Sequence, residues 1–161
     1  MLRISTTLLL AFAFASAAVH AATATTGVAF IHGTGSQTDA YHDYWQPTMV
    51  DNVRNGLVNK SNYVVINCDL NQYMWDSRAA GCVATQLTNF LNTHSVNDLV
   101  VITHSNGGNV IRWILSNPTY DSRYPAIISK IRWVNALAPS SAGTPLADAV
   151  IAGNVFESAL G

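Results

Sequence analysis

Four short runs of apolar residues, many of them β-branched, recur along the chain and are separated by longer polar or amphipathic stretches. The runs cover residues 27–31, 63–68, 98–103 and 131–137. Because apolar residues occupy consecutive positions, both faces of each strand are expected to be buried, as in a parallel sheet.

Segments with apolar residues at helical spacing lie between and after these runs. The expected helices begin near Pro47, Val83, Asn106 and Gly143. Strands that alternate with helices require crossover connections. The sequence therefore predicts an α/β fold, a mainly parallel sheet with helices on both faces.

The first 21 residues have the features of a cleaved secretory signal. Arg3 is followed by the apolar stretch 8–15, and Val19-His20-Ala21 offers small residues at the cleavage position. The protein is thus expected to be secreted or periplasmic. Residues 22–161 are expected to form one partial domain, and no later segment is long and apolar enough to span a membrane.

Charged residues make up 11% of the chain and the formal net charge is −1. This is well below the usual charge content of soluble domains and leaves no electrostatic footprint for nucleic acid. Asp39, His42 and Asp43 could be read as metal ligands, but the sequence offers no further ligand near them to complete a metal site. This run is interpreted as a solvated turn, and neither a metal nor a cofactor is predicted.

The two cysteines, Cys68 and Cys82, are expected to form a disulfide, because export places them in an oxidising compartment. The alternative, a reactive thiol, lacks a neighbouring His or Lys in sequence.

The third apolar run leads into Thr103-His104-Ser105-Asn106-Gly107-Gly108 and then an amphipathic helix. A strand, a tight turn carrying one serine and a helix are the layout of a nucleophile elbow. Thr103 stands where the usual first glycine would be. The backbone N–H of Asn106 is expected to face an oxyanion formed at Ser105. The alternative is that Ser105 merely caps the helix.

The first apolar run ends in His32-Gly33-Thr34-Gly35, where such enzymes place the second half of an oxyanion hole. The Thr34 N–H is the expected donor. The alternatives for this segment are an ordinary glycine-rich turn and a phosphate-binding loop. The sequence lacks the Gly-Lys-Ser/Thr of a P-loop.

Three segments together resemble the N-terminal half of a bacterial secreted lipase or esterase of the α/β-hydrolase superfamily. They are residues 30–35, residues 102–108 and residues 135–148. The resemblance implies ester hydrolysis through an acyl-enzyme on Ser105, with Thr34 and Asn106 binding the oxyanion. It implies an ester or lipid substrate, triacylglycerol included. It leaves the oligomeric state and the acyl-chain preference open.

The family's chain order is serine, then an acid, then histidine. All five histidines precede Ser105: His20, His32, His42, His94 and His104. The acids that follow it, Asp121, Asp148 and Glu157, do not match the triad position. The chain is therefore expected to end after the fourth strand, without its triad acid and base, and to be inactive by itself. Its last strand would be an unpaired, aggregation-prone edge.

Among the tryptophans, Trp113 and Trp133 are expected to pack in the core, and Trp75 is the candidate for substrate contact. A second interpretation stays open. The chain could be a non-catalytic secreted binding protein, or an inactive fragment, that retains the elbow. A peptidase or another acyl hydrolase on the same scaffold is also compatible with these residues.

Overall fold

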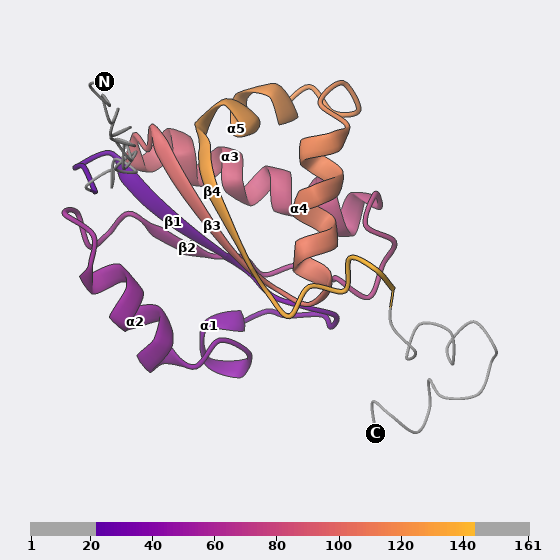
Figure 1. The fold of residues 1–161 in the computed structure, drawn as a ribbon, viewed down its shortest axis with the longest axis horizontal. Coiled ribbons are helices and arrows are strands. Elements are labelled where there is room, and N and C mark those ends of the chain that lie inside the picture. Colours follow the sequence, from indigo (N-terminus) through magenta and orange to yellow (C-terminus); the bar gives the residue numbers. More distant parts are fainter. Residues whose placement is uncertain (1–21, 144–161) are drawn as a thin grey trace, which may run out of the picture.

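The structure is a computed structural model that describes residues 22–143. A parallel four-stranded sheet in the order β2-β1-β3-β4 forms its centre (Figure 1). The strands are β1 (Thr26–Ile31), β2 (Tyr63–Val65), β3 (Asp98–His104) and β4 (Ile131–Leu137). Each matches one predicted apolar run, so the predicted α/β fold with a parallel sheet is confirmed.

The second strand is shorter than its apolar run, which continues to Cys68. Ile66 still donates its N–H to the Phe30 carbonyl of β1. The next two backbone N–H groups donate to side chains and not to a neighbouring strand. Asn67 N–H donates to Gln86 Oε1, and Cys68 N–H donates to His32 Nε2. The chain leaves the sheet there because side-chain acceptors replace the strand carbonyls.

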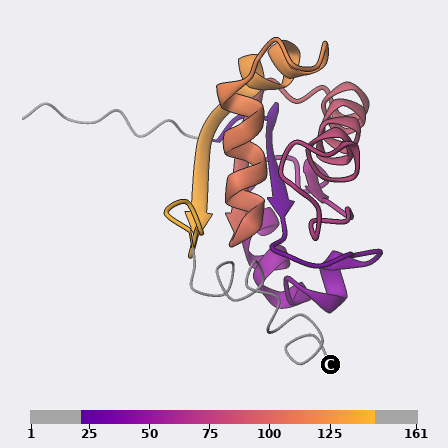
Figure 2. The ribbon, with the colours of Figure 1, turned by 90° about the vertical axis from the view of Figure 1, so that its right-hand side faces the viewer.

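Helices cover both faces of the sheet, as predicted (Figures 1 and 2). On one face lie α1 (Ala40–Asp43) and α2 (Pro47–Asn55), which bury Trp45 and Val50 against Phe30 of β1. The opposite face carries α3 (Cys82–His94), α4 (Asn106–Ser116) and α5 (Tyr124–Lys130). A π-helical turn, η1 (Ser77–Gly81), leads directly into α3.

Three of these elements, α1, η1 and α5, have no counterpart among the predicted helices. The first is a single turn that Asp39 caps by accepting a hydrogen bond from the His42 N–H. In α5 only Ser129 and Lys130 separate the apolar Ile127 and Ile128 from Ile131 of β4, so the helix is too short for a clear helical periodicity. Such short elements form because their apolar residues meet the core, as Tyr124 and Ile127 do.

The fourth strand differs from its prediction in burial. Its partner is β3 on one side, and no other strand of the described residues pairs with it. Six of its seven residues are exposed, and Trp133 has 66% of its surface open to solvent. The expectation that Trp133 packs in the core is therefore wrong within the described part of the chain, because no element covers either face there.

The predicted disulfide is present, with Cys68 Sγ and Cys82 Sγ 2.02 Å apart. It joins the loop after β2 to the first residue of α3. The predicted signal segment 1–21, the helix expected from Gly143 onward, Asp148 and Glu157 lie outside the described residues. Within residues 22–143 no helix is both long and apolar enough to cross a membrane.

Candidate active site

Ser105 occupies a sharp turn between the last residue of β3 and the first residue of α4. Its backbone has φ 48° and ψ −122°, a conformation that residues with side chains rarely adopt. Its N–H donates to the Leu137 carbonyl over 3.1 Å, and its own carbonyl accepts the Gly108 N–H over 3.1 Å. The side chain makes no capping hydrogen bond to the helix and is partly exposed. Ser105 therefore occupies the N-cap position of α4, but its side chain does not cap the helix.

Gly107 lets the first turn of α4 approach the end of β1. A Cβ built on it would lie 2.6 Å from the Ile31 carbonyl oxygen and would also overlap the His32 carbonyl. The clash is with backbone, which cannot move aside as a flexible side chain could. The glycine predicted two positions after the serine is therefore required by packing.

The loop after β1 lies against Ser105. A Cβ built on Gly33 would sit 2.9 Å from the Ser105 Cβ. Thr34, the next residue, is exposed. Asn106 is the first residue of α4, where backbone N–H groups lack helical partners. The structure thus places the loop that contains Gly33 and Thr34 and the first turn of α4 next to the serine.

His32 is completely buried and uses both ring nitrogens locally. Its Nδ1 lies 2.7 Å from the Gly33 carbonyl oxygen, and its Nε2 lies 3.4 Å from the Cys68 amide nitrogen. A carbonyl can only accept and an N–H can only donate, so the ring is neutral with its proton on Nδ1. Burial lowers its pKa, which favours the same neutral form. His32 is not free to act as a base for Ser105.

The loop after β2 holds the Thr34 loop in place. Gln37 N–H donates to the Cys68 carbonyl over 3.0 Å, and Leu70 N–H donates to the Gly35 carbonyl over 2.8 Å. The Leu70 carbonyl in turn accepts the side-chain amide of Asn106 over 3.0 Å. One disulfide-anchored loop therefore contacts both halves of the predicted oxyanion site.

Two residues that the sequence did not single out for this site also lie here. The Tyr44 hydroxyl and His104 Nδ1 share a hydrogen bond. The same hydroxyl would overlap a Cβ on Gly33, so it lies on the side of Gly33 that faces Ser105. Tyr44 follows α1 and has no motif around it, and only the tertiary structure brings it to the serine.

The remaining sequence candidates lie elsewhere. His42 pairs with Asp39 at 2.6 Å on an exposed turn, and His94 ends α3 beside the Phe90 ring. Trp75 stacks on Tyr73 with ring centroids 5.0 Å apart, and its other neighbour is Trp113. Trp113 comes seven residues after Asn106, roughly 10 Å along the helix axis, so Trp75 lies beside α4 rather than at its N-terminus.

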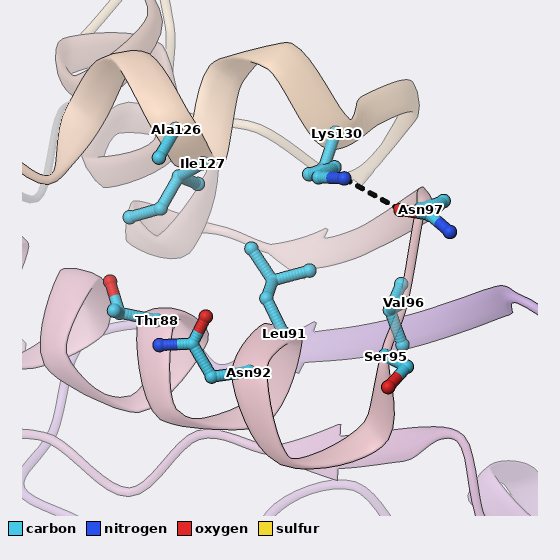
Figure 3. Close-up of a pocket in the computed structure, with 9 residues that line it drawn as sticks. All are labelled: Thr88, Leu91, Asn92, Ser95, Val96, Asn97, Ala126, Ile127 and Lys130. Carbon is cyan, nitrogen blue, oxygen red and sulfur yellow. Dashed lines mark hydrogen bonds between the residues drawn. The ribbon is translucent and has the colours of Figure 1, made fainter.

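Two surface cavities accompany the fold. One of about 350 Å³ lies between α3 and α5, where Lys130 Nζ donates to Asn97 Oδ1 over 2.6 Å (Figure 3). It opens at the amino end of β3, roughly 20 Å from Ser105 at the carboxyl end. Ligands of open α/β sheets bind at the carboxyl ends, so this cavity does not belong to the site.

The second cavity, about 500 Å³, follows the outer face of α4 between Asn109 and Asn117 and is bordered by Ser140. Asn109 links this cavity to the site, because its side-chain amide donates to Asn106 Oδ1 and to Ser140 Oγ. No group of three His, Cys, Asp or Glu side chains within residues 22–143 is placed to hold a metal ion.

Comparisons with known proteins find similarity in structure but not in sequence. No protein-family model matches the chain. No curated protein sequence matches it either. Among solved structures, it is similar to the crystal structure of the Bacillus licheniformis lipase BlEst2 in its mature form, with a TM-score of 0.60 and 18% sequence identity. The match covers 85% of this chain and 50% of that chain, so this chain spans about half the length of the lipase. The chain therefore has an α/β-hydrolase-like fold in common with a lipase.

Proposed function

We propose that this chain carries the nucleophile and oxyanion site of an exported carboxylic ester hydrolase, a lipase or esterase. The observation that carries the proposal is the backbone of Ser105, held at φ 48° between β3 and α4 with its side chain free of the helix. Strained conformations of this kind persist where the surrounding structure holds them, and they concentrate at active sites. The lipase-like fold supports the same reaction class.

In the proposed reaction the Ser105 oxygen attacks the ester carbonyl while a base accepts its proton. The developing oxyanion is stabilised by the backbone N–H groups of Thr34 and Asn106, since donors fixed by the fold need little rearrangement when charge develops. The alcohol leaves, an acyl-enzyme remains on Ser105, and water then releases the acid. No cofactor takes part.

The proposal leaves the general base and the triad acid to groups outside these 161 residues. No histidine follows Ser105, and His32 is buried with both nitrogens occupied. Export through residues 1–21 and an ester or lipid as the substrate belong to the same proposal. Trp75, with Tyr73 and Trp113 beside it, is proposed to contact the apolar part of the substrate.

The experiment that tests this proposal adds imidazole as a general base in place of the triad histidine. The purified chain is incubated with ethyl p-nitrophenyl methylphosphonate, with and without added imidazole, and labelled residues are located by peptide mass mapping. Imidazole takes the Ser105 proton, the Oγ–P bond forms, and p-nitrophenolate leaves without needing an acid. We expect imidazole-dependent labelling of Ser105 and none in Ser105→Ala. Labelling no faster than at the surface hydroxyl of Ser129 would contradict the proposal.

A further inference from the structure

We infer that the Tyr44 hydroxyl is a third donor to the oxyanion at Ser105. This inference rests on the proposed function and extends it with a side chain that lies outside the two backbone segments. It starts from the finding that the hydroxyl and the Ser105 Cβ occupy the space that a Gly33 side chain would fill. The hydroxyl thus borders the position that a substrate attacked by Ser105 must enter.

The Tyr44 ring is held in place by aromatic neighbours. Its centroid lies 5.5 Å from that of His32, 5.6 Å from that of His104 and 5.7 Å from that of Trp45. The backbone is held as well, because the Tyr44 N–H donates to the Ala40 carbonyl over 3.2 Å. A donor fixed in this way costs little reorganisation when charge develops, which is what oxyanion stabilisation requires.

The inference assigns the Nδ1-protonated tautomer to His104, in which the hydrogen bond to Tyr44 leaves the hydroxyl hydrogen available to the substrate. A tyrosine hydroxyl donates one hydrogen bond and can accept others. With the His104 proton on Nδ1, the imidazole donates to the Tyr44 oxygen, and the hydroxyl hydrogen is free to point at Ser105. Accepting a hydrogen bond also polarises the hydroxyl and makes it a stronger donor.

The protonation of Tyr44 suits a donor. Burial raises the pKa of its hydroxyl, and a backbone hydrogen bond from Gly33 opposes that rise only in part. This shift favours the protonated hydroxyl, the form that can donate.

The experiment compares the rates of imidazole-dependent labelling of Ser105 by ethyl p-nitrophenyl methylphosphonate. The phosphoryl oxygen gains negative charge during attack, as an ester oxyanion does. Tyr44→Phe keeps the ring and removes the hydroxyl, and we expect it to slow labelling by about 100-fold, the effect of losing one oxyanion donor. The matched control is Tyr41→Phe, which removes a hydroxyl that donates to Asp51 over 2.9 Å within the α1–α2 pair. It should label at the wild-type rate.

A second probe separates a donor from a structural role. In the corresponding phosphonothioate, sulfur replaces the phosphoryl oxygen and accepts hydrogen bonds only weakly. If Tyr44 donates directly, the ratio of the wild-type to the Tyr44→Phe labelling rate should be several-fold smaller with the phosphonothioate than with the phosphonate. An equal rate ratio with both probes overturns the inference. So does wild-type-like labelling of Tyr44→Phe. Failure of the wild-type chain to label at all overturns the proposed function itself, and the inference with it.

Discussion

The imidazole of His32 lies 2.7 Å from the carbonyl oxygen of Gly33, its neighbour in sequence. That carbonyl and the Thr34 N–H belong to one planar peptide unit and point in opposite directions. The histidine therefore sets the direction of the N–H proposed to bind the oxyanion. Its own position is set by the Cys68 amide at its other nitrogen.

The buried His32 predicts a pH-dependent stability. Its pKa is lowered from 6.5 by burial, so below pH 6.5 the unfolded chain binds a proton that the folded chain excludes. The free energy of unfolding is expected to be at its full value above pH 6.5 and to fall as the pH falls toward the lowered pKa. Denaturant titrations between pH 5 and pH 8 measure how the free energy of unfolding changes with pH. In His32→Gln this pH dependence should be weaker. An identical pH dependence in the variant would show that other groups cause it.

Ser105 is expected to lower the stability of the fold through its backbone conformation. Glycine tolerates φ 48°, so Ser105→Gly should raise the free energy of unfolding by about 1 kcal/mol. Ser105→Ala is the control, because alanine keeps the strain while removing the hydroxyl. Both variants lose labelling, and only the glycine variant should gain stability in thermal and denaturant unfolding. Equal stabilities would indicate that the turn is not strained.

The disulfide should stabilise both the fold and the site. Cys68 and Cys82 are 14 residues apart, for which the chain-entropy model gives about 3 kcal/mol. The Cys68→Ser, Cys82→Ser double variant is expected to lose that amount in denaturant unfolding. Hydrogen exchange of the Gln37 amide, which donates to the Cys68 carbonyl, should accelerate as well. Reduction of the wild-type chain provides the control and should reproduce both effects.

The chain by itself is expected not to turn over p-nitrophenyl esters, because no histidine follows Ser105 in the sequence and His32 is buried with both ring nitrogens occupied. Release of p-nitrophenolate should equal the buffer rate and be unchanged in Ser105→Ala. Turnover that depends on Ser105 in the absence of imidazole would show that a base is present within the 161 residues.

The exposed fourth strand predicts self-association. Trp133, Val134 and Leu137 present apolar surface on an edge strand, an arrangement that promotes pairing between chains. Light scattering should show concentration-dependent association that Leu137→Lys weakens. Leu115→Lys on α4 is the control, since Leu115 and Leu137 have equal exposed fractions of 37%. A monodisperse monomer at all concentrations would contradict the prediction.

Local pattern was sufficient for the strands and for the serine turn. Continuous β-branched runs identify strands without reference to the rest of the chain, and the turn at Ser105 could be predicted because strand, turn and helix are contiguous. The disulfide needed only two cysteines and a signal-like N-terminus. The same reasoning missed α1, η1 and α5, which are too short for periodicity to show and form because the core accepts their apolar residues.

What the sequence indicated by itself is therefore the chemistry carried by single contiguous segments: the proposed nucleophile at Ser105 and the proposed donors at Thr34 and Asn106. Tertiary structure alone decided which distant residues support them. Tyr44 reaches the serine because α1 packs at the end of β1, and Cys68 reaches His32 because β2 pairs with β1. It also decided that β4 is exposed, since burial depends on what covers a strand and not on its own composition.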